Sequence, residues 1–321
     1  MTLRVMVKGF LALLLAVGTV QAATKVQIAQ GESVLTLRVD GEVSIDPEGR
    51  VLDYRILTKL EPPIQKLVAK AVPTWRFRPI AVDGKAAAAK SPMRITLAAT
   101  EVKGGYEVRV DNVVFRSNTQ EEYDAERAAA QALAEQGKTL GLAGEPAEPE
   151  PVVSITSIKM TPPGYPVGMQ LAGVEGLVLL NVRLNRDGTV ADVFASQSSL
   201  LNVKGKPELL DRARVMLEKN AAGAAAKWKF KVEAKEVAGL KASDLTVRVP
   251  VQYVLSSGGA SSESLAGKWR QEFRGPNYPV PWLLGTEDER AVGVSDLNDG
   301  EYLAGSSPFG LSDKNVIGGV L

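Results

Sequence analysis

The residue types that carry most enzyme and metal chemistry are missing from this chain. Its 321 residues include no histidine and no cysteine. Without histidine, the side chain that usually serves as a general base near neutral pH and as a metal ligand is absent. Without cysteine, thiolate chemistry and disulfides are excluded. The composition therefore rules out a Ser-His-Asp triad and a His-ligated zinc site, and we expect no cofactor.

Two groups of charged residues remain as chemical candidates. Acidic and amide side chains gather near the C-terminus, at Asp296, Asn298, Asp299 and Glu301. Their spacing does not follow the ligand order of an EF-hand loop, so we interpret them as a solvated turn. Alternating lysines occur at Lys227, Lys229 and Lys231. Such lysines usually keep a strand edge soluble, with binding of an envelope polyanion as the alternative. No arrangement of carboxylates or of serine with lysine stands out, so we predict that the chain is not an enzyme.

The net charge and the N-terminal residues limit which kinds of partner the chain can have. Lys plus Arg is 38 and Asp plus Glu is 37, which gives no basic surplus for nucleic acid. Arg4 and Lys8 precede an apolar run, Gly9–Val20, that ends in Ala22 and Ala23. This order is typical of a secretory signal peptide over residues 1–23. The alternative is an uncleaved anchor, which would bring the chain to the membrane.

Two stretches of the chain show the same order of elements. In residues 24–117 a hairpin turns at Gly49, and apolar residues at helical spacing follow over 64–72. Trp75-x-Phe77 comes next, with alternating strands over 93–98 and 106–115. Residues 152–255 repeat this plan with strands over 177–184 and from 189, a helix over 211–217, Trp228-x-Phe230 and a strand over 245–254. We therefore predict an α+β fold of two small domains, each an antiparallel sheet with a helix on one face.

The remaining segments read as connections. Residues 118–151 combine a thinly apolar helix over 120–136 with an acidic, proline-rich linker. Residues 256–321 are rich in Gly, Ser and Pro with isolated aromatic residues. This composition predicts an irregular C-terminal tail, either without structure or wrapped around a partner.

The motifs of the second stretch occur in a specific order. They are Pro163-x-Tyr165-Pro166, Gly173–Gly176, Asp187-Gly188-x-Val190 and Trp228-x-Phe230. Together they resemble the C-terminal domain of TonB energy transducers, and the first stretch is similar to a degenerate member without the Tyr-Pro motif. The resemblance implies a periplasmic location in a Gram-negative envelope. It also implies an envelope protein partner, in the family an outer-membrane transporter, whose peptide adds as an edge strand.

The resemblance also suggests where such a partner would bind. The segment with Tyr165 and Pro166 precedes the first strand of the domain, at the place that touches the transporter peptide in the family. The last strand, with Val247, Val249, Val251 and Tyr253, is the second candidate, because Pro250 favours an edge position. The alternative is that these four side chains simply face the helix.

Transducers carry an uncleaved anchor with a histidine and a long proline-rich spacer, and this chain has neither the histidine nor a spacer of that length. We therefore predict a periplasmic binding protein, with an inner-membrane-anchored energy transducer as the alternative.

Overall fold

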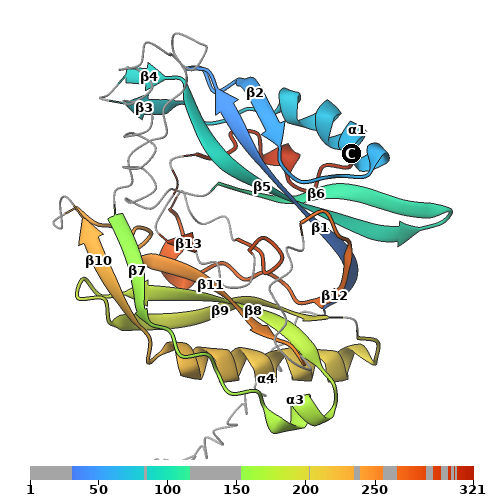
Figure 1. Ribbon diagram of the computed structural model, residues 1–321, viewed down its shortest axis with the longest axis vertical. Coiled ribbons are helices and arrows are strands. Elements are labelled where there is room, and N and C mark those ends of the chain that lie inside the picture. Colours follow the sequence, from blue (N-terminus) through green and yellow to red (C-terminus); the bar gives the residue numbers. More distant parts are fainter. Residues whose placement is uncertain are drawn as a thin grey trace, which may run out of the picture.

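A computed structural model shows the chain as one large antiparallel sheet with helices on one face (Figure 1). It describes residues 31–82, 85–115, 153–201, 203–234, 239–255, 266–286, 292–297, 303–304, 307 and 309–321. The strands of the large sheet follow the order β13-β11-β8-β9-β12-β1-β5-β6, and β2 also pairs with β1. The predicted α+β class is therefore confirmed.

The helices and strands have the following bounds. Residues 31–115 form β1 (Glu32–Ile45), β2 (Val51–Ile56), α1 (Pro62–Ala71), η1 (Val72–Thr74), β3 (Ile80–Val82), β4 (Lys85–Ala87), β5 (Ala89–Val102) and β6 (Gly105–Phe115). Residues 153–255 form β7 (Val153–Lys159), α3 (Val167–Leu171), β8 (Glu175–Leu184), β9 (Val190–Leu201), α4 (Pro207–Ala225), β10 (Lys229–Ala234) and β11 (Thr246–Tyr253). The remainder contributes β12 (Arg270–Arg274), η2 (Pro281–Leu283), β13 (Leu303–Ala304) and η4 (Lys314–Val316). We call residues 31–115 the first unit and residues 153–255 the second unit.

Both hairpin turns depend on a glycine. Gly49 and Gly188 have φ of 80° and 79°, a region that side chains rarely adopt. A Cβ at Gly49 would lie 2.1 Å from the carbonyl oxygen of Phe77, and one at Gly188 would lie 1.8 Å from that of Phe230. The amide of Phe77 donates to Gly49 O at 2.8 Å, and the amide of Phe230 donates to Gly188 O at 2.9 Å. In each unit the hairpin turn thus rests directly on the Trp-x-Phe segment.

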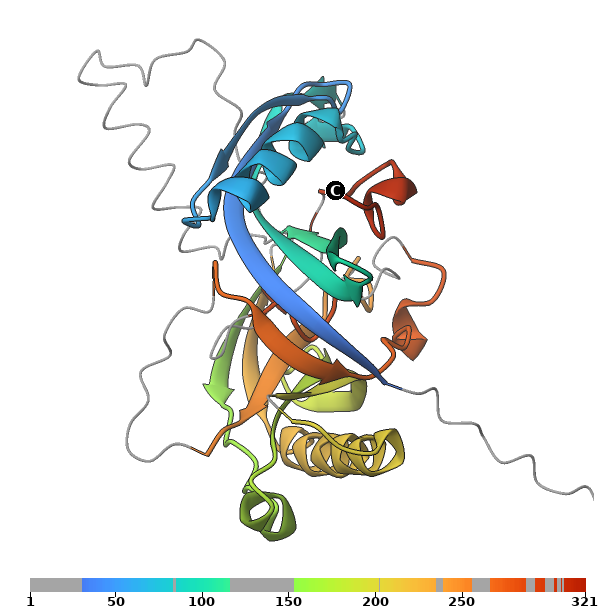
Figure 2. The same cartoon turned by 90° about the vertical axis from the view of Figure 1, so that its right-hand side faces the viewer.

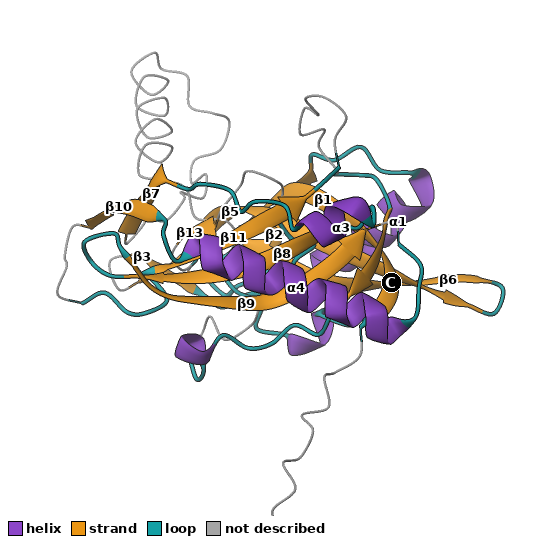
Figure 3. Ribbon diagram, turned by 90° about the horizontal axis from the view of Figure 1, so that it is seen from below, coloured by secondary structure: helices purple, strands orange, loops and turns teal. Residues whose placement is uncertain are grey.

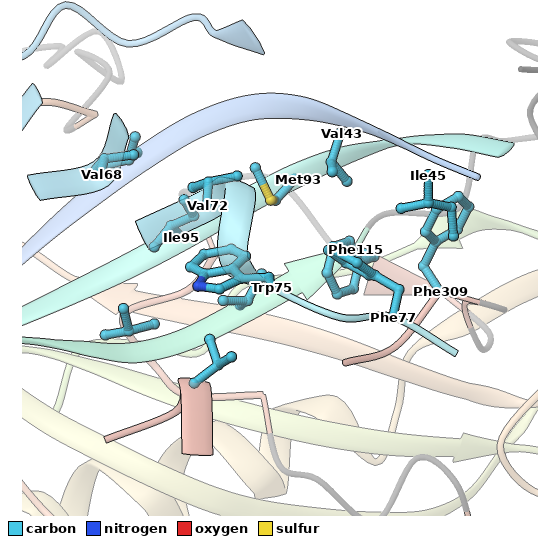
Figure 4. Packing of buried hydrophobic residues seen from close by; sticks show 14 of the residues in the cluster. Val43, Ile45, Val68, Val72, Trp75, Phe77, Met93, Ile95, Phe115 and Phe309 are labelled. Carbon is cyan, nitrogen blue, oxygen red and sulfur yellow. The ribbon is translucent and has the colours of Figure 1, made fainter. Parts of the chain in front are cut away.

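Each unit packs its helix and its Trp-x-Phe segment over the sheet. Trp75 and Phe77 are buried in one apolar cluster and Trp228 and Phe230 in a second one. Figure 4 shows Trp75 and Phe77 beside Met93 and Phe115 in the first cluster. On α4 the buried apolar residues recur every three or four positions, at Leu210, Ala213, Leu217, Ala221 and Ala225. This spacing puts them on one face of the helix, which packs against β8 and β9.

The prediction of an irregular C-terminal tail was wrong at β12, while most other described residues of the tail have no regular secondary structure. Strand β12 inserts between the units: Ser33 pairs with Phe273 on one side, and Leu200 pairs with Phe273 on the other. Phe273 is buried in the core of the second unit, and its neighbours Glu272 and Arg274 are buried as well. Both units therefore share one continuous sheet, as Figure 2 shows along its edge.

The surface between the units is polar. Glu272 is fully buried and accepts hydrogen bonds from Thr36 Oγ1 at 2.7 Å, Arg270 Nη2 at 2.6 Å and Ser199 Oγ at 2.9 Å. Burial alone would raise its pKa, but the charge of Arg270 and the hydrogen bonds outweigh burial, so the pKa of Glu272 is lowered. A charged glutamate in this place holds β1, β9 and β12 together.

The expectation of a solvated turn at Asp296 was also wrong. Asp296 is buried, and its carboxylate accepts from Thr96 Oγ1, from Asn112 Nδ2 at 2.6 Å and from the amide of Gly293 at 2.5 Å. Burial, the largest cause, raises the pKa of Asp296. Asn298, Asp299 and Glu301 lie outside the described residues. Among the described residues, no group of acidic side chains is arranged to hold a metal ion.

Two predicted segments cannot be compared with the structure. The signal peptide over 1–23 and the spacer over 118–151 lie outside the described residues. Of the helices that the structure does describe, none combines the length and the apolar character needed to cross a membrane.

Candidate partner-binding site

The segment Thr161–Pro166 is fastened at both ends. Trp228 Nε1 donates a hydrogen bond to the carbonyl oxygen of Thr161 at 2.9 Å. At the other end, Pro166 is the N-cap of α3, and its carbonyl oxygen accepts from the amide of Met169 at 2.9 Å. Two hydrogen bonds therefore hold the segment beside the core of the second unit, and α3 leads from it to β8 (Figure 3).

Tyr165 brings this segment to the end of β11. Its ring packs edge-on against the ring of Tyr253, with centroids 5.4 Å apart and an interplanar angle of 79°. Its hydroxyl donates to the carbonyl oxygen of Val174 at 2.6 Å, while Tyr253 donates to Asn220 Oδ1 at 2.7 Å. Burial is the main cause that raises the pKa of both tyrosines. Both hydroxyls thus remain neutral hydrogen-bond donors that fix the two rings in place.

The structure therefore brings the two predicted groups of site residues together at Tyr165 and Tyr253. The side chains of β11 are not free to contact a partner, however. Val247, Val249, Val251 and Tyr253 are all buried in the core cluster that also contains the apolar face of α4. These four side chains stabilise the second unit, and only the outer backbone of the strand remains for a partner.

The direction of the backbone groups of β11 follows from its pairing with β8. Leu245 O accepts from Leu184 N at 2.8 Å, and the register between Thr246 and Tyr253 has no bulge. Because backbone groups alternate sides along an antiparallel strand, the odd-numbered residues face β8 and the even-numbered ones face away. The outward positions are thus Arg248, Pro250 and Gln252.

The outer edge of β11 is only partly covered among the described residues. Strand β13 pairs with Val247 and Arg248 alone. Beyond that point, Pro250 offers a carbonyl oxygen but no N–H, and Gln252 offers both. This leaves a short stretch of edge, from Pro250 to Tyr253, directly beside Tyr165. Such an edge can accept an added strand by main-chain hydrogen bonds.

Comparison with known proteins finds similarity over about a third of the chain. The chain is 40% identical over 104 residues to the protein TonB of two Xanthomonas campestris pv. campestris strains, B100 and ATCC 33913. The chain contains a TonB C-terminal-like domain. The match covers 32% of this chain and 40% of each relative, so the chain spans only about two-fifths of the length of the curated relatives it matches.

A solved structure is also similar to this TonB-like chain. It is the solution NMR structure of the Pseudomonas aeruginosa TonB C-terminal domain, with 22% sequence identity and a TM-score of 0.19. The similarity covers 33% of this chain and 90% of that one. No family model matches the chain.

Two contacts around the TonB-like site were not predicted from the sequence. Glu175 Oε1 accepts from the amide of Leu255 at 2.8 Å and closes the end of β11. Trp282 Nε1 donates to Thr246 Oγ1 at 2.9 Å at the other end, while the Arg183 guanidinium lies 5.6 Å from the Trp282 ring centroid. The isolated aromatic residues of the tail were the only signal in the sequence that a packing role existed there.

Proposed function

We propose that the chain is a periplasmic TonB-like protein that recognises an envelope protein by edge-strand addition at β11. The observation that supports this proposal is that no described strand pairs with the outer edge of β11 at Pro250–Tyr253, where Gln252 is half-buried, next to the Tyr165–Tyr253 ring contact. The relatives are named TonB, which supports a role at the cell envelope and in transport. A partner peptide in extended conformation would pair with Gln252 and pass over the segment that contains Tyr165 and Pro166.

The chemistry of this edge limits what it can bind. Pro250 donates no hydrogen bond, so an added strand depends on the N–H of Gln252 and on the carbonyl oxygens of Pro250 and Gln252. Each main-chain hydrogen bond contributes about 0.5–1.5 kcal/mol net. We therefore expect weak pairing that needs further contact with the Tyr165 segment, of the kind suited to an outer-membrane transporter that is engaged and released.

Substitution of Gln252 tests strand addition directly. Gln252→Pro removes the outward N–H, while pairing with β8 continues through the odd-numbered residues. Gln252→Ala removes the same side chain and keeps the N–H, so it is the matched control. The chain has no cysteine, so Gly164→Cys, beside Tyr165 and with no atom within 4 Å of an added Cβ, provides a single thiol for crosslinking in cells. We expect Gln252→Pro to abolish the crosslink to an outer-membrane protein and Gln252→Ala to retain it. Equal crosslinking in both variants would exclude strand addition at β11.

A membrane-anchored energy transducer is the second candidate function. It is favoured by the identity to TonB itself over a third of the chain and by the apolar run Gly9–Val20. The two functions differ in the mature N-terminus. A protein that begins at Ala23 or Thr24 has lost the run and cannot be anchored through it, whereas an intact Met1 supports the transducer.

A further inference from the structure

The last residues of the chain pair with the Trp-x-Phe segment of the first unit. We call residues Phe309–Leu321 the C-terminal arm. The amide of Arg78 donates to Gly310 O at 2.8 Å, and the amide of Ser312 donates to Arg76 O at 2.9 Å. Phe77 and Leu311 form an antiparallel bridge between these bonds. The arm therefore adds a short strand beside Phe77, although more than two hundred residues separate the two in sequence.

The same arm then adds a second strand, to the edge of β6. Gly318 N donates to Val110 O at 2.7 Å, Val110 N donates to Gly319 O at 3.0 Å, and Leu321 N donates to Val108 O at 2.9 Å. Because β6 is the last strand of the large sheet at this end, the arm occupies the edge that would otherwise be open.

A side chain anchors the arm between these two pairings. Phe309 is 3% exposed and belongs to the core cluster of the first unit. Its ring centroid lies 5.9 Å from that of Phe115, which in turn lies 5.4 Å from that of Phe77. Figure 4 shows Phe309 beside Ile45, Phe77 and Phe115. The arm thus adds a third phenylalanine to the Phe77–Phe115 contact in the core of the first unit.

In the second unit a different segment provides the pairing partner of the Trp-x-Phe strand. There β10, which contains Phe230, pairs antiparallel with β7, so that Phe230 lies opposite Ser157. Strand β7 directly precedes the Tyr165 segment in sequence. The arm pairs with Phe77 in the same antiparallel sense in which β7 pairs with Phe230.

From these contacts we infer that the first unit is a peptide-binding site whose occupant is the chain's own C-terminal arm. The site accepts an extended peptide with an aromatic residue at its start and a strand-forming, carboxyl-terminal end that pairs with Val108 and Val110. In the structure the arm fills this site in cis, through the bonds of Gly310, Ser312, Gly318 and Leu321. This inference concerns the first unit and does not depend on strand addition at β11.

Peptide binding to an arm-released, full-length chain tests the inference. Phe309→Ala removes the anchor. Gly318→Pro removes the N–H that bonds Val110 and is incompatible with φ of 81° at that position. The probe is a fluorescent synthetic peptide with the sequence of residues 309–321, measured by anisotropy. We expect the double variant to bind it at least tenfold more tightly than the unchanged chain, in which the site is filled.

Two altered probes check that the peptide binds as the arm does. A Phe309→Ala probe should bind at least tenfold more weakly. A Val320→Thr probe should bind equally well, because Val320 is 61% exposed. A folded double variant that binds the probe no better than the unchanged chain overturns the inference, as does equal binding of the Phe309→Ala probe. If the unchanged chain binds the probe only after the chain has been diluted, the arm fills the site of a second copy of the chain. That result would contradict pairing in cis.

Hydrogen exchange keeps the inference testable if the double variant does not fold. In the single variant Gly318→Pro, exchange of the Val110 amide should accelerate at least tenfold relative to the Val320→Thr control. Unchanged protection of Val110 would show that the arm does not cover β6, and the inference would fail.

Discussion

Replacement of Gly188 by alanine should unfold the second unit far more readily than replacement of a turn glycine in open space. At φ of 79° an alanine costs about 1–2 kcal/mol. Its Cβ would also lie 1.8 Å from Phe230 O, so the backbone of the Trp-x-Phe strand must move away. That movement breaks the bond from Phe230 N to Gly188 O, worth about 1 kcal/mol, and strains a packed core by about 1–3 kcal/mol. We therefore expect Gly188→Ala to lower the free energy of unfolding by about 3–6 kcal/mol.

Gly173→Ala is the control, because Gly173 lies in the same unit, has φ of 67° and has no atom within 4 Å of an added Cβ. It should cost only the conformational part, about 1 kcal/mol. Urea denaturation followed by circular dichroism gives both values. If Gly188→Ala and Gly173→Ala differ by less than 1 kcal/mol, close contact between turn and strand does not explain why glycine is needed at position 188.

Three further predictions concern the buried polar groups and the Trp228 contact. Glu272→Gln leaves the Arg270 guanidinium, whose side chain is 12% exposed, without its charged partner and should cost about 3–5 kcal/mol in urea denaturation at neutral pH; a cost below 1 kcal/mol would contradict a structural role. Because the folded pKa of Asp296 is raised, its contribution to stability is complete below its ordinary value of 3.8 and is lost as pH rises through the raised pKa. The stability of the unchanged chain relative to Asp296→Asn should therefore fall as pH increases from about 4 to 7, and a constant difference would refute this. Trp228→Phe removes the bond to Thr161 and should cost about 1 kcal/mol, together with faster exchange of the Met169 amide; unchanged exchange would show that the segment does not need this bond.

Local features of the fold were predictable because their causes are local. Helix α1 was expected over 64–72 and occupies Pro62–Ala71, and the helix expected over 211–217 is the centre of α4. Apolar spacing alone sets which face of a helix is buried. The buried state of Trp75 and Trp228 was equally predictable, since aromatic residues of this size stabilise a core most when buried.

The pairing of β12 with β1 and β9 was not predictable from local pattern. Its five residues, Arg270–Arg274, include three charged side chains, which would be expected to lie exposed to solvent. Arg270 pairs with Glu272 within the strand, but Arg274 is neutralised by residues far away in sequence, such as Asp111, which accepts from Arg274 Nη1 at 2.5 Å. A strand whose buried face is made of ion pairs carries no apolar alternation, so composition alone suggested an irregular tail.

The packing of the residues proposed for the candidate site was predictable only in part. The alternation of β11 was read correctly as one face, and that face packs on α4. Sequence could not show that Tyr165 meets Tyr253, because the contact joins residues on different elements. Nor could it show that the outer edge is covered at Arg248, since β13 is too short to give a pattern of its own.

The position of β12 has a consequence for any partner at β11. Strands β9 and β12 are bonded to each other and to their neighbours, so the chain from β11 to β1 is one hydrogen-bonded sheet. Because a sheet resists displacement of one strand relative to the next, the first unit cannot turn freely while the second unit holds a partner. Glu272 bonds to Thr36 and to Ser199, and so its side chain ties both units to β12. The orientation of the first unit relative to a bound partner is therefore set by strand pairing and by the buried hydrogen bonds of Glu272 at β12, and Glu272→Gln should loosen that orientation before it unfolds either core.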